Sequence, residues 1–254
     1  MKKTAIIGVL VLVLTICLNV SANTHIPILL YHDVQTDYPA EKAISTISPQ
    51  MFEEHIVTLL NNGYTPISYD DIYNASKGSF TMPEKPIVIC FDDGYIGNYT
   101  HAYPILCKYG VKATIFVVAQ TVGHVLPTSV HFDWEQAKIM QKSGLVSIQS
   151  HTYSHEDLSK MSSFQLEREL RFSKYLVEKN LGTKCNYVAF PYGFYNQNVQ
   201  DAAKRAGYVI TSQVGNNGIN TVADAQSRPL IRITTFGSWS GEDVINIIKT
   251  NAEQ

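Results

Sequence analysis

Short apolar runs of strand length alternate with helix-like segments along most of the chain, and this alternation restricts the fold more than any other feature. The run Pro86–Phe91 is continuous and apolar, as in a strand that is buried on both faces. Ser162 followed by Gln165 is the capping-box pattern that begins a helix. Strands that alternate with helices form βαβ units. The sequence therefore predicts an α/β domain with a parallel sheet, either open or closed into a barrel.

The pattern assigns eight strands and seven helices. Strands are predicted at 26–31, 64–68, 86–91, 113–118, 145–149, 187–190, 208–211 and 230–234. Helices are predicted at 49–63, 70–75, 98–109, 132–142, 162–178, 196–206 and 241–250. No internal repeat or low-complexity linker interrupts this series, so the sequence predicts one domain.

The N-terminus has the pattern of a secretory signal peptide. Met1-Lys2-Lys3 is basic, an apolar run extends from Ala5 to Val20, and Val20-Ser21-Ala22 supplies small residues for cleavage. The run is short for a spanning helix, which favours cleavage over an uncleaved N-terminal anchor. We expect a signal peptide over residues 1–22. The remainder, 23–254, is then a secreted, periplasmic or cell-surface domain without a membrane span.

Composition excludes several classes of protein. The formal net charge is −2, without a long block of one sign, which argues against nucleic-acid partners and electrostatic membrane binding. Hydrophobic residues make up 45% of the chain, enough for a sizeable core. Cys90, Cys107 and Cys185 follow the predicted cleavage site, and so small and odd a set is not a disulfide scaffold. Cys90 is predicted to be buried, and a Cys107–Cys185 bridge stays open.

Polar motifs follow four of the predicted strands at the point where each strand ends. His32 follows the first strand, Asp92 and Asp93 the third, His151 the fifth, and Pro191-Tyr192-Gly193 the sixth. Each motif alone is weak, since Asp-Asp-Gly is usually a turn and a lone histidine is often a core residue. The carboxyl ends of parallel barrel strands meet on one face, where active sites lie. Their shared position therefore predicts one catalytic site.

Two adjacent carboxylates and two imidazoles give this site its chemistry. Asp92 and Asp93 are neighbours, and His151 and His155 are spaced i, i+4. One aspartate with two histidines is a common way to hold a catalytic divalent metal, because positions stay open for water and substrate. The other aspartate is then free to act as a base. The sequence thus favours an enzyme over a binding module.

These motifs resemble those of the polysaccharide deacetylases, carbohydrate esterase family 4, which carry the NodB-homology domain. Cys90-Phe91-Asp92-Asp93-Gly94-Tyr95 is similar to their T-F-D-D-G motif, and Ser150-His151-Thr152-Tyr153-Ser154-His155 to H-[ST]-x-x-H. Ala189-Phe190-Pro191-Tyr192-Gly193 is similar to R-x-P-[FY], with Ala189 in place of the arginine. The resemblance covers about residues 26–250 and implies a single distorted (β/α)7-type barrel of mostly parallel strands.

Two features depart from the usual motifs of this family. Both resemble a permuted subgroup typified by the poly-N-acetylglucosamine deacetylases. The usual C-terminal L-x-H motif, which supplies the catalytic acid, is absent after Arg232. Leu30-Tyr31-His32-Asp33-Val34 near the N-terminus is similar to the Y-H motif that supplies the acid in that subgroup. The third motif of the subgroup also lacks its arginine. Arg232, on a late strand, is a candidate for the missing cation near the base.

The resemblance also implies a role for each motif residue. Asp93, His151 and His155 would hold one divalent ion, Zn²⁺ first, with Co²⁺, Ni²⁺ or Fe²⁺ as alternatives. Asp92 would be the base that takes the proton of the attacking water, and His32 the acid that protonates the leaving amine.

Three further residues would complete the substrate site. The backbone N–H of Tyr192 would help to hold the oxyanion, with Pro191 and Tyr95 beside the substrate. Aromatic faces for sugar rings could come from Tyr95, Trp134, Tyr153, Tyr192 and Trp239. Core packing is the alternative, and it explains Trp134 at least as well.

The implied activity is hydrolysis of N-acetyl groups from an N-acetylglucosamine-containing polysaccharide by a monomeric enzyme, with release of acetate. Peptidoglycan and O-acetylated xylan stay open as substrates. A secreted glycoside hydrolase is an alternative, but adjacent aspartates rarely straddle a glycosidic bond at the required separation. An inactive carbohydrate-binding domain is a third hypothesis, which the presence of both Asp92 and His32 disfavours.

Overall fold

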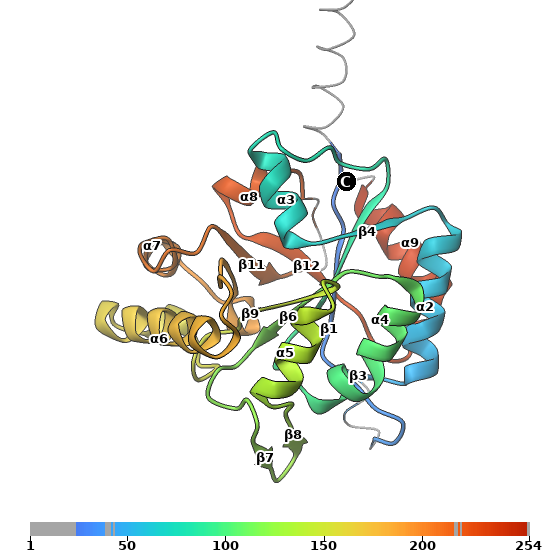
Figure 1. Ribbon diagram of the computed structural model, residues 1–254. Helices are drawn as coiled ribbons and strands as arrows, with labels where there is room; N and C mark the ends of the chain where they lie inside the picture. The colour runs from blue at the N-terminus through green and yellow to red at the C-terminus, as the bar shows by residue number, and fades with distance from the viewer. Residues whose placement is uncertain (1–23, 39–41, 43, 216–217, 219, 253–254) are drawn as a thin grey trace, which may run out of the picture.

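Eight parallel strands form the main sheet of the computed structural model, which describes residues 24–38, 42, 44–215, 218 and 220–252. The strand order is β1-β12-β11-β10-β9-β6-β5-β4, and β1 also pairs with β5. This second pairing closes seven strands into a barrel and leaves β4 outside the ring (Figure 1). The predicted seven-stranded barrel is therefore confirmed. The strands are β1 (Ile28–Tyr31), β4 (Thr65–Ile67), β5 (Pro86–Phe91), β6 (Ala113–Val117), β9 (Val146–Ser150), β10 (Tyr187–Ala189), β11 (Ile210–Val214) and β12 (Leu230–Thr234).

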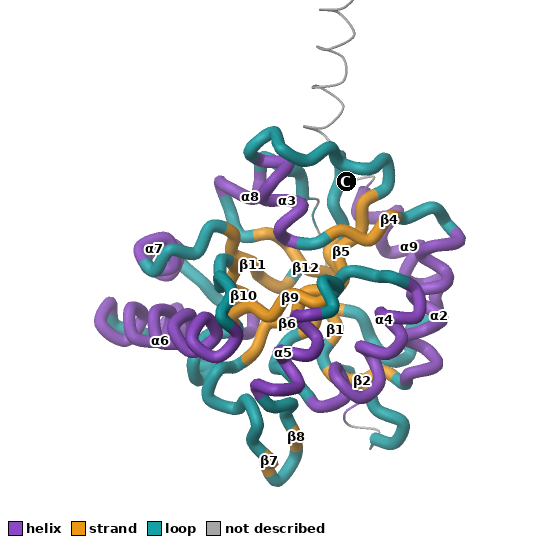
Figure 2. The backbone as a smooth tube through the Cα atoms, in the orientation of Figure 1, coloured by secondary structure: helices purple, strands orange, loops and turns teal. Residues whose placement is uncertain are grey.

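Helices surround this barrel on its outer side (Figure 2). They are α2 (Pro49–Asn61), α3 (Tyr69–Ser76), α4 (Tyr103–Tyr109), α5 (Trp134–Lys142), α6 (Ser163–Leu181), α7 (Gln197–Arg205), α8 (Asp224–Ser227) and α9 (Gly241–Ala252). The predicted capping box of α6 is confirmed, since Ser162 and Gln165 each accept a hydrogen bond from the other's backbone N–H. This bonding satisfies donors that a helix N-terminus otherwise leaves unpaired.

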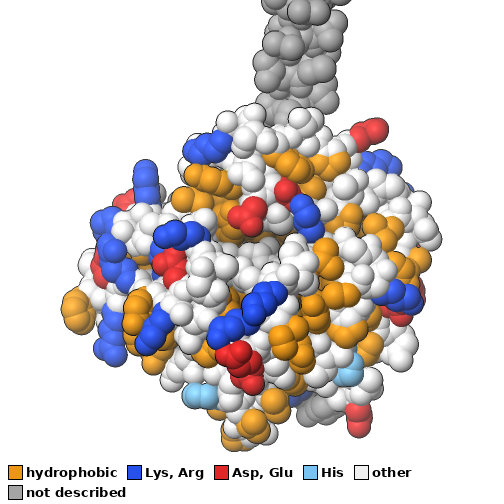
Figure 3. All heavy atoms as spheres, in the orientation of Figure 1, with side chains coloured by type: hydrophobic (Ala, Val, Ile, Leu, Met, Phe, Trp, Pro, Cys, Tyr) orange, Lys and Arg blue, Asp and Glu red, His pale blue; other side chains and the backbone are white. Residues whose placement is uncertain are grey.

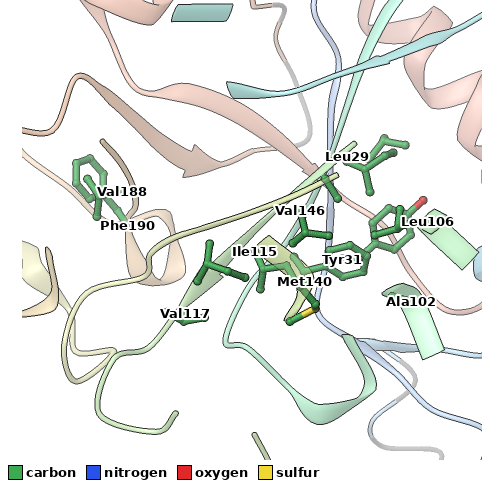
Figure 4. Packing of buried hydrophobic residues seen from close by; sticks show 14 of the residues in the cluster. Leu29, Tyr31, Ala102, Leu106, Ile115, Val117, Met140, Val146, Val188 and Phe190 are labelled. Atoms are coloured by element: carbon green, nitrogen blue, oxygen red, sulfur yellow. The ribbon is translucent and has the colours of Figure 1, made fainter. Parts of the chain in front are cut away.

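Successive residues of each barrel strand face opposite sides, and both sides are apolar. Leu29 and Tyr31 belong to the cluster that includes Leu106 and Met140 of the helices, so this set faces outward (Figure 4). Residues of the other parity cluster with one another across the barrel: Ile28, Leu30, Val88, Cys90, Phe116, Tyr187, Ala189, Ile210 and Leu230. Side chains alternate between inward and outward along each strand. If this alternation continues past the ends of β1 and β5, the next inward-facing residues are His32 and Asp92. The strand pattern therefore aims both side chains at the mouth of the barrel.

The barrel is distorted between β9 and β10, which meet at the pair Ser150–Val188. Before this pair, β9 and β10 are not joined by a ladder of backbone hydrogen bonds, and the Gln149 side chain bridges the two strands instead. Its Oε1 accepts the N–H groups of Asn186 and Tyr187 at 2.9 and 3.0 Å. The distortion lies before Ser150, so the end of β9, where the metal-binding motif begins, is paired with β6 on one side and with β10 on the other.

Some predicted elements differ from the structure. The helix predicted at 98–109 begins as a π-helical turn, Asn98–Ala102, in which the N–H of Tyr103 reaches Asn98. Pro104 lacks an N–H, so the ordinary bond to residue 100 cannot form there. The helix predicted from residue 132 begins at Trp134, because Asp133 caps it.

Short elements were missed because two-residue strands carry no periodicity. These are β2 (Asp33–Val34) with β3 (Thr46–Ile47), the hairpin β7 (Val125–Leu126) with β8 (Ser129–Val130), α8, and the 3₁₀ turn Leu158–Lys160. The turn at Pro191-Tyr192-Gly193 is present as a second 3₁₀ turn, Pro191–Gly193. Cys90, Cys107 and Cys185 are free thiols, with Cys90 and Cys185 buried, so the structure contains no Cys107–Cys185 bridge.

The predicted signal peptide lies outside the described residues. Among those that the structure describes, no helix combines the length and apolar character that a membrane crossing needs.

Candidate metal centre and active site

Asp92 lies at the barrel mouth in a buried ion pair with Arg232. The guanidinium reaches both carboxylate oxygens, at 2.5 and 2.8 Å, and the two side chains are 0% and 3% exposed. Burial raises the pKa of the Asp92 carboxyl, but Arg232 and then His151 outweigh it and lower that pKa to about 2. Asp92 is therefore an ionised carboxylate across the neutral pH range. Arg232 on β12 therefore provides the cationic side chain beside Asp92. Ala189 on β10, which stands in place of the arginine of the family motif, cannot provide it.

Asp93, His151 and His155 converge beside this pair. One ligand atom from each lies within 4.8 Å of the others. The Nε2 atoms of His151 and His155 are 3.8 and 3.5 Å from Oδ1 of Asp93. Because Nδ1 of His151 donates to the carbonyl of Ala189 at 2.9 Å, its Nε2 carries the lone pair. This atom also lies 3.5 Å from Oδ2 of Asp92.

The protonation of this cluster suits a cation. Burial lowers the pKa of His151 to about 3 and also lowers the pKa of His155, so both imidazoles are neutral and able to act as ligands. Burial raises the pKa of Asp93 to about 6, and a bound cation would oppose that rise. A carboxylate with two neutral imidazoles is a donor set that fits a divalent metal ion.

The backbone of the site is strained. Among the described residues, the four non-glycine residues with positive φ are Asp93, Thr152, His155 and Tyr192, at 69°, 67°, 63° and 59°. Such conformations cost on the order of 1–3 kcal/mol each and persist where surrounding contacts impose them. All four belong to the motifs that the sequence singled out. Because all four lie at the site, its backbone geometry lowers the free energy of unfolding, and the surrounding contacts maintain it.

Contacts that the sequence did not predict hold Asp93 in place. Nδ1 of His131 lies 3.1 Å from the Asp93 carbonyl and donates to it. The phenol of Tyr95 donates to the Asp93 carboxylate, and its ring stacks on that of His131 with centroids 5.1 Å apart. His131 follows β8, so the hairpin ties the metal loop to the barrel. No sequence signal marks His131, because it is a lone histidine beyond a two-residue strand.

His32 lies with the two carboxylates after β1. Its charged form would interact with both Asp92 and Asp93. Asn98 fixes the backbone by donating to the His32 carbonyl at 2.7 Å. Nδ1 of the ring is buried without a hydrogen-bond partner among the described residues, unlike most buried polar atoms. The His32 ring as a whole is only partly buried, so its access to a substrate comes from the part of the ring other than Nδ1.

The 3₁₀ turn Pro191–Gly193 forms the side of the site next to His155. Pro191 is buried, whereas Tyr192 is 58% exposed and its ring lies edge-on to His155 at 4.7 Å. Gly193 has φ of 74°, and a Cβ there would lie 2.7 Å from the backbone N of Val214. The turn is therefore pressed against β11, which fixes the Tyr192 N–H. Trp134 and Trp239 are partly buried and pack against the core.

Comparison with known proteins places this site in a family. The family model Polysaccharide deacetylase matches residues 80–211, just over half of the chain. This segment includes the Asp-Asp-Gly, His-x-x-x-His and Pro-Tyr-Gly motifs. The chain belongs to the polysaccharide deacetylase family and is a hydrolase.

Individual relatives agree with this assignment. The YxkH protein of Bacillus subtilis (strain 168) is 33% identical over 203 residues, 80% of this chain and 67% of that protein. The poly-beta-1,6-N-acetyl-D-glucosamine N-deacetylase of Staphylococcus aureus (strain MRSA252) is 30% identical over 175 residues, 64% of this chain. The match spans 59% of that enzyme. The solved Streptococcus pyogenes deacetylase PplD, in complex with acetate, has a TM-score of 0.78 and 30% identity, covering 88% of this chain and 97% of its own.

Proposed function

We propose that this enzyme removes N-acetyl groups from an N-acetylglucosamine-containing polysaccharide, with Asp92 as base and His32 as acid. The observation that carries the proposal is the joint placement, at one barrel mouth, of an ionised carboxylate, a metal-ligand triad and a partly buried histidine. The staphylococcal relative is named for this substrate, which supports the choice of polymer.

A metal held by Asp93, His151 and His155 would polarise the acetyl carbonyl and acidify a bound water toward pKa ~7. Zn²⁺ is the ion we propose, since two imidazoles and one carboxylate are a common zinc set. Asp92 receives the proton of the attacking water and stays oriented because Arg232 holds both its oxygens. The backbone N–H of Tyr192 would stabilise the oxyanion. His32 donates a proton to the leaving nitrogen, which is otherwise a very poor leaving group.

Acetate release from N-acetylglucosamine polymers, peptidoglycan and acetylated xylan tests this proposal. Protein treated with a strong chelator should be inactive, and Zn²⁺ or Co²⁺ should restore it. Chain length should stay unchanged while free amines appear. Shortened chains without acetate would support the glycoside hydrolase, and full activity in verified metal-free protein would refute the metal-dependent mechanism.

Two substitutions test the roles of the base and of the acid separately. Asp92→Asn keeps the shape and removes the base, so kcat should fall by about 10²–10⁴ while one equivalent of metal is retained. His32→Ala should act in the same way. An active His32→Ala enzyme would show that another group supplies the proton.

The signal-peptide pattern supports action outside the cytoplasm, on biofilm or wall glycans. Deacetylation exposes amines that are protonated at neutral pH, so its effect there is a more cationic polymer. N-terminal sequencing of the exported protein should begin at Asn23, whereas an intact Met1 would indicate an uncleaved anchor.

A further inference from the structure

His55 on α2 is a buried histidine to which the proposed reaction assigns no role. It is 0% exposed, and side chains close the surface over the region of α2 and α4 on the face that Figure 3 shows. Burial lowers the pKa of His55 against the opposing effects of the Trp239 carbonyl, Glu54 and Asp243, so the ring is neutral at pH 7. The neutral ring has one N–H and one lone pair, and both need partners in the interior.

Each nitrogen of the His55 ring has such a partner. Nε2 lies 2.7 Å from the carbonyl oxygen of Trp239, which can only accept, so Nε2 carries the proton and donates. Nδ1 lies 3.1 Å from the phenol oxygen of Tyr31, and its lone pair accepts the hydrogen bond of the hydroxyl. The ring therefore joins the end of β1 to the loop that follows β12.

Tyr31 connects this ring to the proposed acid and base. It is the last residue of β1 and directly precedes His32, and its carbonyl accepts the N–H of Asp92 at 3.0 Å. Its ring is 1% exposed and lies 5.6 Å from that of Phe91. A hydroxyl in such apolar surroundings costs free energy unless it is bonded, and the imidazole provides that bond. The backbone of Tyr31 thus borders both reacting groups.

The loop after β12 is fastened to β1 at two points. At its start, the N–H and the hydroxyl of Thr235 both donate to the Leu30 carbonyl at 2.9 Å. Further along, the Trp239 carbonyl is held by His55. Since β12 carries Arg232, the same imidazole contributes to the placement of the strand end from which the partner of the base projects.

The backbone is important for His32 because its ring has few other contacts to orient it. An imidazole is commonly oriented by a hydrogen bond to its second nitrogen. Among the described residues, Nδ1 of His32 has no such partner. Asn98 holds the carbonyl of His32 at 2.7 Å, and Tyr31 precedes it in the chain. The bonds on either side of His32 therefore take a large part in directing its ring.

We propose that His55 is a positioning residue, which acts through Tyr31 on His32 and Asp92 without contacting the substrate. The inference rests on the proposed function, because it takes the roles of acid and base from it. A histidine suits this position, since one rigid ring bonds a donor at one edge and an acceptor at the other. Its loss displaces the reacting groups and leaves the surface that binds the glycan unchanged, so kcat should fall while KM stays.

The test compares His55→Leu and Tyr31→Phe with wild type in acetate release from N-acetylglucosamine oligomers. Leu59→Ala is the control, since Leu59 lies one turn further on α2, is 2% exposed, and bonds neither end of the imidazole. In both test variants kcat should fall about tenfold or more, with KM and metal content within about twofold, and the control should keep its kcat within about twofold.

The double variant should lose little more than His55→Leu alone, because both substitutions break the same hydrogen bond. His55→Gln, which keeps a donor and an acceptor, should recover part of the lost kcat. Tyr31→Phe removes a single oxygen and carries the test if His55→Leu does not fold. Full kcat in Tyr31→Phe, or an equal loss in Leu59→Ala, would overturn the inference.

Imidazole ¹H–¹⁵N spectra of metal-free protein separate this inference from the proposed chemistry. The His32 signals should shift in His55→Leu and in Tyr31→Phe and stay in place in Leu59→Ala. If wild type releases no acetate but these shifts occur, the link from His55 to His32 stands and the proposed reaction fails. If wild type is active and the His32 signals shift in neither variant, the reaction stands and the inference fails.

Discussion

Replacement of Arg232 by methionine should destabilise the metal-free protein strongly at neutral pH. Arg232 is fully buried and contributes both hydrogen bonds of the ion pair with Asp92. Removing one partner of a buried pair leaves an uncompensated charge and costs about 3–5 kcal/mol. The exposed pair Arg171–Glu167 on α6 offers a matched control, since Arg171 is 56% exposed and surface pairs contribute about 0–1 kcal/mol.

The loss should depend on pH in a defined direction. In wild type the Asp92 pKa is lowered from 3.8 to about 2, which corresponds to about 2 kcal/mol. That stability is present above pH 3.8 and disappears as pH falls through 2. Without Arg232, burial raises the Asp92 pKa, so the variant loses stability as pH rises. The difference between the two proteins should therefore be large at pH 7 and narrow below pH 4.

Urea unfolding of chelator-treated protein across this pH range measures the effect. The metal-loaded variant should also lose activity, because a protonated Asp92 cannot accept the proton of water. A loss under about 1 kcal/mol at pH 7 would contradict the uncompensated-charge argument. An equal loss at pH 3 and pH 7 would show that the arginine acts through packing alone.

Three further outcomes follow from the same structure. Tyr95→Phe keeps the ring but removes the bond to Asp93, so Zn²⁺ affinity in a chelator competition should fall about tenfold or more; unchanged affinity would show that this bond does not position the ligand. Gly193→Ala should lower the free energy of unfolding more than Gly110→Ala does. Both glycines have positive φ, but only at Gly193 would the added Cβ lie 2.7 Å from a backbone atom. Equal losses in thermal unfolding would contradict this. In native protein comprising residues 23–254, Cys107 should react quickly with a thiol reagent while the two buried cysteines, whose pKa values burial raises to about 12, should not; rapid reaction of all three would contradict their burial.

Local chemistry accounts for the elements that the sequence predicted well. The continuous apolar run of β5 and the capping box of α6 act through neighbouring residues, so their signals are present in short windows. The short hairpin β7–β8 and the π-helical turn before Pro104 escaped prediction. The first is too short for a period to appear, and the second depends on how one proline perturbs a helix.

The sequence by itself determined the alternation that builds the barrel and the parity that turns His32 and Asp92 to its mouth, because period-two side-chain direction is a property of each strand. Motif resemblance supplied the expected ligands Asp93, His151 and His155. The sequence offered Arg232 as a candidate, and the tertiary structure decided which partners complete the site. Arg232 reaches Asp92 from β12, and His131 supports Asp93 from a hairpin. The contact between Arg232 and Asp92 depends on closure of the sheet between β1 and β5, which joins residues far apart in the chain and leaves no local sequence pattern.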